Sequence, residues 1–447
     1  MCPRAPPARI SVAEDRSDGG KPQRSRLSCV DGGAALRLTA REDPLRKARR
    51  FMILHSFRRS PVAVISLAQL FGTSLWFSSN AVTRDLSALW QLDAAGIGWL
   101  TAAVQAGFIA GTLGLALTGL ADRYRASQIF ALCACLGAAL NAAFALWAPG
   151  LTEGLVLRFL VGLSLAGIYP IGMKLMVRWA PQKAGWGLSV LVAMLTLGTA
   201  LPHGMRAAAG GLPWQGVVLG ASGLAVLAAG LVLCLGEPGG PASAARPPRL
   251  RETLSGLVAA FRVPAFRAAA LGYFGHMWEL YAFWTLVPLL LAMRLGAEGD
   301  LSLFSFAVIA VGAAGCLLGG LLARRSSGHQ VARASLRISG ACCLVIGLAG
   351  GVLPVWMFGA VFLIWGATVV SDSPQFSAIC ATACPPALVG SALSMMNAIG
   401  FAITMVSIAL TTGVAGGLGL QTALILSLGP ALGLLALREG RADQAAR

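Results

Sequence analysis

Continuous apolar runs of about twenty residues follow one another along the chain after residue 57, and they restrict the possible folds. A helix rises 1.5 Å per residue, so each run is long enough to cross the roughly 30 Å hydrocarbon core of a bilayer. The runs do not alternate every second residue, which favours transmembrane helices over the strands of a β-barrel. Twelve spans are predicted, at 61–82, 97–117, 128–147, 154–177, 185–202, 216–236, 268–290, 301–323, 336–353, 355–378, 390–412 and 417–437.

The charge content supports a membrane protein and argues against a nucleic-acid partner. Only 12% of the residues are charged, whereas soluble proteins average about 25%. The net charge of +17 divides into +6 for residues 1–57 (12 Lys+Arg minus 6 Asp+Glu) and +11 for the remainder (23 minus 12). The later basic residues are scattered between apolar runs and form no patch interleaved with aromatic residues, as a nucleic-acid groove would.

The distribution of basic residues predicts the topology. An even number of spans puts both termini on one side of the membrane. If that side is the cytoplasm, eighteen of the 23 Lys and Arg residues after residue 57 lie in inner segments, and only Arg84, Arg206 and Arg294 lie in outer loops. Basic residues are enriched in cytoplasmic loops, so we expect both termini on the cytoplasmic side of the membrane.

Polar segments divide the chain into predicted parts. Residues 1–57 lack the apolar core of a secretory signal and are typical of a disordered cytoplasmic tail, unless translation begins at Met52. A Pro- and Arg-rich segment then separates two groups of six spans. The predicted parts after the first tail are a bundle at 58–236, a cytoplasmic loop at 237–267, a bundle at 268–437 and a cytoplasmic tail at 438–447.

The two predicted bundles share a sequence pattern. Two prolines and one Leu-Ser dipeptide recur on equivalent spans with offsets of 204, 204 and 205 residues, which indicates a duplicated plan. The pairs are Tyr169-Pro170 with Ser373-Pro374, Ala180-Pro181 with Cys384-Pro385, and Leu188-Ser189 with Leu393-Ser394.

Two motifs add a family resemblance. Leu120-Ala121-Asp122-Arg123 lies between the second and third spans, and Arg158 with Gly162 gives R-x-x-x-G in the fourth. With the twelve spans and the basic central loop, these motifs resemble the major facilitator superfamily of secondary transporters over residues 58–440. The loop departs from the family pattern at Thr118 and Arg125, where the family has glycine.

The resemblance implies an all-α membrane protein with twelve transmembrane helices in two pseudo-symmetric six-helix bundles. It also implies alternating access, in which the bundles rock about a central cavity. In this family the acid of the loop motif braces the two bundles, so Asp122 and Arg123 are the candidates for that role here.

Glu279 is the main chemical candidate, because it lies near the middle of the seventh span. A charge there costs at least ~2.5–3.5 kcal/mol on insertion scales, so such residues are usually functional. His276 lies three positions earlier, on the same helical face. An apolar environment favours the neutral form of an acid, so the pair could carry a proton. With Tyr281 and Trp284 nearby, we expect these residues to line one solute cavity, although a structural hydrogen bond would also explain Glu279.

Five further residues are candidates for the proton or solute pathway. Arg158 is at a position that, by resemblance, handles protons or anions, and Asp372 near Pro374 could form an inner gate or bind the solute. Tyr169, Gln375 and Asn397 complete the set, although single polar residues in a span are more often contacts between helices.

A small-residue face on the second span indicates a close helix contact. It consists of Gln105, Gly107, Gly111 and Gly114, and it would suit an interface at which helices slide.

Enzyme and cofactor motifs do not appear in the sequence. There is no Walker loop, no HExxH, and no cysteine spacing typical of a metal site, so we expect no enzyme activity, no cofactor and no metal. The sequence therefore predicts a monomeric, proton-coupled secondary transporter of a small organic solute, with efflux and uptake both open. The alternative is a membrane sensor or scaffold that keeps the fold without transport.

Overall fold

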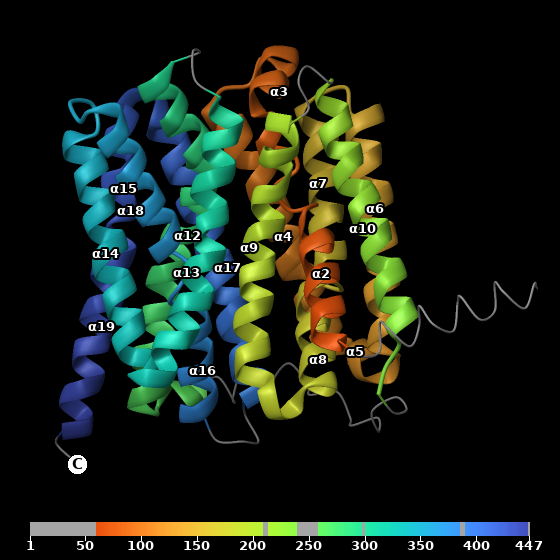
Figure 1. The fold of residues 1–447 in the computed structure, drawn as a ribbon, viewed down its shortest axis with the longest axis vertical. Helices are drawn as coiled ribbons and strands as arrows, with labels where there is room; N and C mark the ends of the chain where they lie inside the picture. The colour runs from red at the N-terminus through yellow and green to blue at the C-terminus, as the bar shows by residue number, and fades with distance from the viewer. Residues whose placement is uncertain (1–59, 209–212, 239–257, 297–299, 385–388, 446–447) are drawn as a thin grey trace, which may run out of the picture. The chain divides into compact units, whose positions relative to one another are not determined.

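The computed structural model describes residues 60–208, 213–238, 258–296, 300–384 and 389–445, without the side chains of Asp122 and of residues 183–185, 389–391 and 439–445. The predicted tail at 1–57 and most of the predicted central loop lie outside these residues. All regular structure in the described ranges is helical, and the long helices run along one common direction (Figure 1). We call the end of this bundle at α3 (Thr83–Trp90) the α3 end and the opposite one, at α5 (Leu120–Arg123), the α5 end.

The helices of the first six predicted spans are α2 (Pro61–Thr73), α4 (Ala94–Thr118), α6 (Ala126–Trp147), α7 (Leu151–Leu165) with α8 (Tyr169–Trp179), α9 (Ala184–Ala208) and α10 (Trp214–Leu235). Those of the second six are α12 (Pro264–Leu295), α13 (Leu301–Arg325), α14 (Gly328–Ala349), α15 (Val355–Thr368) with α16 (Ser373–Ala383), α17 (Val389–Leu418), and α18 (Thr422–Leu426) with α19 (Leu428–Ala445). Short 3-10 turns are η1 (Asn80–Val82), η2 (Pro181–Lys183) and η3 (Gly419–Gln421).

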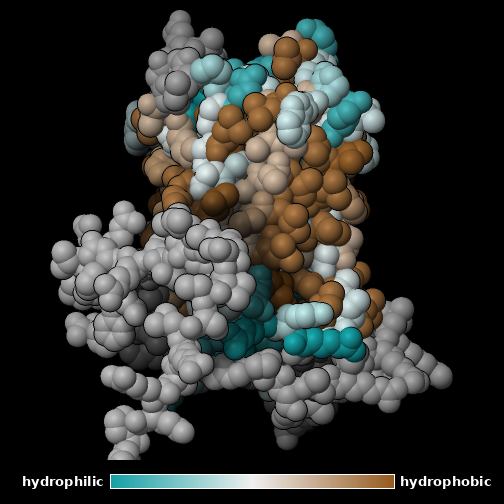
Figure 2. Space-filling model, turned by 90° about the vertical axis from the view of Figure 1, so that its right-hand side faces the viewer, coloured by the Kyte–Doolittle hydropathy of each residue, from teal (hydrophilic) through white to brown (hydrophobic). Residues whose placement is uncertain are grey.

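Each predicted span therefore coincides with helical structure. Ten segments of the described chain are long and apolar enough to cross a membrane; the last, Ala392–Arg438, takes in α17 to α19, and α2 is shorter. Large apolar side chains such as Trp147 and Leu348 are about three-quarters exposed, and an apolar belt with hydrophilic residues towards both ends is visible on the face in Figure 2. Such a belt suits contact with lipid.

Four spans are interrupted: the first, the fourth, the tenth, and the twelfth, where Ser427 separates α18 from α19. The fourth and tenth change helix where Pro170 and Pro374 occupy the first turn of α8 and α16, a position that tolerates the missing N–H of proline. In the first span, α2 ends at Thr73 and irregular turns lead to η1. These breaks free backbone groups inside the bundle, which need other partners.

Some boundaries differ from the prediction. α14 begins at Gly328, whereas the ninth span was predicted to begin at residue 336. The first turns of α14 carry polar residues such as Gln330 and Arg333, so they are not apolar enough to be recognised as part of a span. α19 continues to Ala445, beyond the predicted limit of 437.

Helices from the two predicted halves pack against each other in two places. α4 packs on α17, and α9 packs on α13. Small-residue faces occur at sliding and at static helix contacts alike, and the one on α4 lies against a helix of its own half. A Cβ on Gly107 would lie 1.8 Å from the carbonyl oxygen of Phe159 in α7, so this face holds α4 against a helix of its own half.

Candidate functional site

A small cavity of about 70 Å³ lies between helices of the two halves, and we call it the central cavity. Four of the predicted site residues line it: Tyr169 of α8, Tyr281 and Trp284 of α12, and Asn397 of α17. The rest of the wall is mainly apolar, with Met173, Val192, Leu195, Tyr273, Met277, Leu280, Val370, Ser373, Ser377 and Phe401. Aromatic rings with a few polar groups are the composition of typical ligand sites, but this cavity is much smaller than the roughly 300–1,000 Å³ of such sites.

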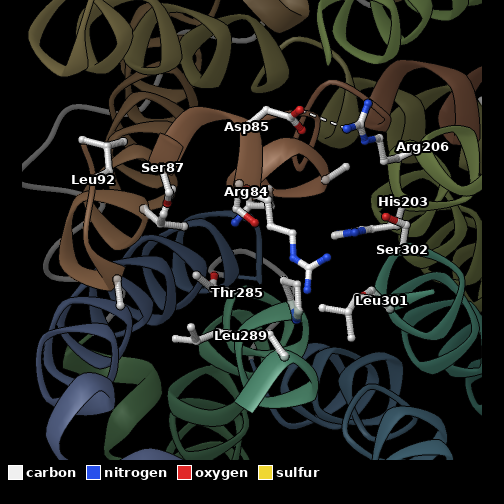
Figure 3. A pocket seen from close by; sticks show the side chains of 18 of the residues that line it. Arg84, Asp85, Ser87, Leu92, His203, Arg206, Thr285, Leu289, Leu301 and Ser302 are labelled. Atoms are coloured by element: carbon white, nitrogen blue, oxygen red, sulfur yellow. Dashed lines mark hydrogen bonds and ion pairs between the residues drawn. The ribbon is translucent and has the colours of Figure 1, made fainter. Parts of the chain in front are cut away.

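A larger cavity of about 480 Å³, the α3-end cavity, lies further along the same helices (Figure 3). On α12 the residues lining it, Thr285 to Ala292, follow those lining the central cavity, and on α9 His203 follows Leu195 in the same way. The two cavities are therefore arranged in sequence along the bundle.

Packed aromatic rings adjoin the central cavity, and on α12 the last of them, Trp284, directly precedes Thr285 of the α3-end cavity; we call these rings the aromatic barrier. Its members are Trp76, Phe77, Phe108, Tyr281, Trp284 and Phe401. The centroid of the Trp76 ring is 4.8 Å from that of Phe108 and 5.6 Å from that of Tyr281, and the Phe77 and Trp284 rings meet edge to face at 5.9 Å. The barrier thus joins side chains of the first two spans to side chains of α12 and α17.

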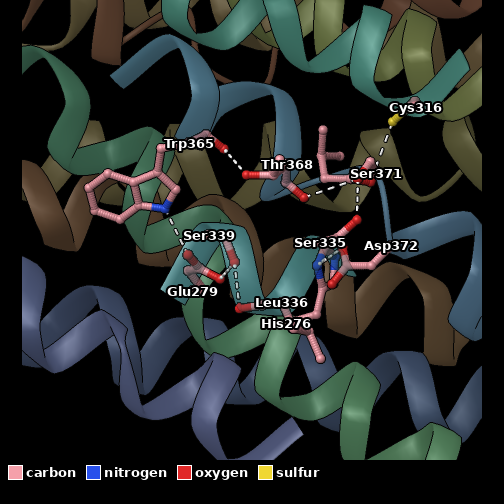
Figure 4. A network of polar contacts seen from close by, with 11 residues as sticks. His276, Glu279, Cys316, Ser335, Leu336, Ser339, Trp365, Thr368, Ser371 and Asp372 are labelled. Carbon is pink, nitrogen blue, oxygen red and sulfur yellow. Dashed lines mark hydrogen bonds and ion pairs between the residues drawn. The ribbon is translucent and has the colours of Figure 1, made fainter. Parts of the chain in front are cut away.

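Glu279 is buried in the middle of α12 and faces α14 and α15, not either of these cavities (Figure 4). Its carboxylate accepts hydrogen bonds from Trp365 Nε1 at 2.7 Å, Ser339 Oγ at 3.0 Å and Cys343 Sγ at 3.3 Å. No ion pair of Glu279 is found among the described residues. Three donors can stabilise a carboxylate, but no positive charge is there to neutralise it.

His276 lies on the same face of α12 as Glu279, as its spacing predicts, but its partner is Asp372 (Figure 4). Nδ1 of His276 is 2.8 Å from Oδ1 of Asp372, and both side chains are almost fully buried. Asp372 precedes α16, so this contact links the centre of α12 to the break in the tenth span. Beside it, Ser335 and Ser371 share a hydrogen bond of 2.6 Å.

The opposite faces of α12 therefore have different surroundings. Tyr281 and Trp284 face the central cavity, whereas Glu279 and His276 face the other helices of the second half. Glu279 and His276 thus line neither of the two cavities, and their role in the solute pathway remains a prediction. Residues two apart on a helix are about 200° apart around its axis, so Glu279 and Tyr281 cannot share a face.

Arg158 is fully buried and holds the interrupted first span. Its guanidinium donates to the carbonyl oxygens of Leu75, at 3.1 Å, and Trp76, and to Ser78 Oγ at 3.2 Å and Asn141 Oδ1 at 3.0 Å. Because α2 ends at Thr73, those two carbonyls lie outside a regular helix, and Ser78 Oγ also donates to the carbonyl oxygen of Leu75 at 3.1 Å. Among the described residues Arg158 forms no ion pair and lines neither cavity.

The other predicted residues lie apart from both cavities. Gln375 is buried near the start of α14, with Oε1 beside Gly328. Arg123 is exposed on α5, and the side chain of Asp122 lies outside the described residues, so the brace role remains a prediction.

Several contributors to the site were not predicted. Trp365, Ser339 and Cys343 hold Glu279, and His203 lines the α3-end cavity. His203 could have been identified from the sequence, because it is a single polar residue in an apolar run. Trp365 and Cys343 could not have been identified in this way, because apolar and small residues are common throughout the spans.

Comparison with known proteins agrees with this architecture. Residues 60–409 match the family model of the Major Facilitator Superfamily. A bacterial homologue of the human lysosomal transporter Spinster, inward-facing and unoccupied, superposes with a TM-score of 0.65 at 16% identity, covering 87% of this chain and 98% of that one. The outward conformation of the transporter FucP gives a TM-score of 0.61 at 17% identity, covering 86% and 99%. At this identity the likeness is one of fold.

A sequence relative is more limited in extent. The niacin transporter NiaP of Acinetobacter baylyi is 37% identical over 125 residues, which are 26% of this chain and 28% of NiaP. The family match, which spans most of the chain, identifies the protein: it belongs to the major facilitator superfamily and is a multi-pass membrane transporter, not an enzyme.

Proposed function

We propose that this protein is a proton-coupled secondary transporter that moves a small organic solute through the central cavity by alternating access. We place its α5 end in the cytoplasm of a bacterium, because the predicted inner segments carry most of the basic residues. The larger cavity then opens towards the outside, and the aromatic barrier separates it from the central cavity. Opening of the α5 end would complete the cycle, with Asp122 and Arg123 as the brace that is released.

The observation that carries the proton coupling is the position of Glu279. It is a buried carboxylate without a basic partner in the described chain, and it lies at the centre of the helix whose other face lines the central cavity. Protonation would remove a charge-assisted acceptor and weaken the bonds from Trp365 and Ser339. That change would alter the packing of α12 on α14 and α15, and so couple the proton to the shape of the cavity. The His276–Asp372 pair, one turn away, is a second group through which a proton could pass.

The solute is proposed from the relative and from the cavity. NiaP is a niacin transporter, and the central cavity here offers Tyr169, Tyr281 and Trp284 for a flat ring. Nicotinate is therefore the first solute to test, followed by other small aromatic acids and amines.

The test uses purified protein in proteoliposomes with an imposed pH gradient, which can be set in either direction. We expect labelled nicotinate or another solute of the panel to accumulate, with proton movement reported by an internal pH dye. The direction of the effective gradient would separate uptake from efflux. Solute movement without proton movement would refute the coupling. If no solute of a broad panel moved across the membrane, the result would favour the sensor or scaffold alternative, in which the fold is kept without transport.

A further inference from the structure

Two buried polar side chains on the wall of the α3-end cavity lack a partner in the described structure. His203 of α9 is 1% exposed and Ser305 of α13 is fully buried, and both line the cavity. Nε2 of His203 and Oγ of Ser305 have no hydrogen-bond partner among the described residues. Buried polar groups are almost always hydrogen-bonded, so this pair indicates a place where a polar group of a ligand is received. The two residues come from different halves of the transporter.

A cationic side chain reaches into the same cavity. Arg84 of α3 points inward, towards His203, in Figure 3. One of its nitrogens donates to the carbonyl oxygen of Gly296 at 3.3 Å, which leaves further N–H groups for a ligand.

The other charges at the cavity are already engaged. Arg206 and Asp85 form an ion pair at 3.0 Å, and Asp93 caps α4 by accepting from the backbone N–H of Gly96 at 2.8 Å. Arg84 is thus the cation that is not held by a carboxylate among the described contacts.

The remaining wall suits an apolar body. Ile97, Leu289 and Leu301 line the cavity, whose volume of about 480 Å³ exceeds that of the central cavity. A guanidinium and two neutral hydrogen-bonding groups beside an apolar wall match the chemistry of a carboxylate on a small hydrophobic group.

We propose that the α3-end cavity is a second binding site, which captures a small monocarboxylate between Arg84, His203 and Ser305 before the solute passes the aromatic barrier. This inference rests on the proposed function only for the order of events, because the site is complete without the central cavity.

The experiment measures binding of two probes of the same shape to the full chain in detergent by isothermal titration calorimetry. The probes are benzoate, which is charged, and benzamide, which is neutral. We expect saturable binding of benzoate, at least about tenfold weaker binding of benzamide, and a similar loss for benzoate in Arg84→Gln, His203→Phe and Ser305→Ala. The matched control is Arg325→Gln, an exposed arginine at the opposite end of α13, which should bind benzoate as the wild type does.

A second measurement does not alter the three binding groups. In Ser302→Cys, which places a thiol on the cavity wall, benzoate should protect that thiol from a water-soluble maleimide and benzamide should not. Equal binding of the two probes, absence of benzoate binding at millimolar concentration, or unchanged affinity in Arg84→Gln would overturn the proposal. Binding with the expected pattern in a protein that transports nothing would refute the proposed transport and leave this site standing.

Discussion

Asn141 and Cys343 lie 202 residues apart (343 minus 141), on α6 and α14, and each contacts a buried ionisable group of its own half, Arg158 and Glu279. Oδ1 of Asn141 accepts from the guanidinium of Arg158, and Sγ of Cys343 donates to the carboxylate of Glu279. This offset is two to three residues shorter than the 204 and 205 residues of the repeated positions, but α6 and α14 are the third helices of their halves. Equivalent helices thus surround a cation in the first half and an acid in the second, so the duplicated plan carries opposite charges in its two copies.

The proton-coupling role of Glu279 is tested by Glu279→Gln. Glutamine keeps the shape and an acceptor oxygen for Trp365 or Ser339 but cannot release a proton. We expect uptake driven by a pH gradient to fall to the background of empty vesicles, while exchange of labelled for unlabelled solute continues. Proteoliposome assays of both modes check this.

The control for fold is Glu279→Leu, which leaves the indole N–H of Trp365 and the hydroxyl of Ser339 without their acceptor. Each such group costs about 1–3 kcal/mol, so this variant should melt at a lower temperature than Glu279→Gln. Normal gradient-driven uptake by Glu279→Gln would show that the coupling proton binds at another residue. The His276–Asp372 pair would then be the next candidate.

Arg158 is expected to stabilise the first span rather than to handle protons or solute. Arg158→Leu removes the guanidinium that donates to the carbonyls of Leu75 and Trp76 and to Asn141. The single hydroxyl proton of Ser78 can serve either Leu75 or Asn141 but not both, so acceptors are left unpaired at about 1–3 kcal/mol each. We predict a large drop in the thermal unfolding midpoint in detergent and a smaller one for Arg158→Lys, whose ammonium reaches fewer acceptors. An unchanged midpoint with lost transport would instead support the role that the family resemblance implied.

The spans could be predicted from the sequence because a helix in a bilayer must be both long and apolar. Pro170 and Pro374 also marked the breaks in the fourth and tenth spans, since proline removes a backbone donor. The break after Thr73 could not be seen, because it depends on Arg158, which is distant in sequence and donates to the freed carbonyls.

The candidate site was predictable only in part. A charged residue in the middle of a span is unusual because placing it in the membrane costs free energy, so Glu279 could be identified from the sequence. Which neighbours it faces depends on helix rotation, and α12 is buried on both sides, so hydrophobicity gave no orientation. The pairing of His276 with Asp372 joins two spans whose contact no local pattern indicates.

The tight contact between α4 and α7 gives a prediction with a matched control. A Cβ on Gly162 would lie 2.0 Å from the carbonyl oxygen of Val104, whereas a Cβ on Gly114, on the same pair of helices, would meet no atom within 4 Å. We expect Gly162→Ala to destabilise the protein by about 1–3 kcal/mol or more, because backbone has to move, and Gly114→Ala to leave it unchanged. Thermal unfolding of both variants measures the difference. Equal stability would mean that the helices separate easily, as a sliding interface would allow.

The aromatic barrier should control access between the two cavities. Trp76 is fully buried and contacts Phe108, Tyr281 and Phe401, so Trp76→Ala removes the ring that links the two halves. A thiol introduced as Ser377→Cys on the wall of the central cavity reports access, since a membrane-impermeant maleimide added at the α3 end must pass the barrier to reach it.

We expect the labelling rate of that thiol to rise clearly in the Trp76→Ala background. Trp356→Ala, which removes an indole that is 74% exposed on α15, should leave the rate unchanged, in a chain whose exposed Cys135 and Cys234 are replaced by serine. A lower or equal rate in Trp76→Ala would show that the rings do not obstruct the path. The distinction is physical: deleting a barrier side chain opens space along the solute route, whereas deleting an exposed ring changes only the contact with lipid.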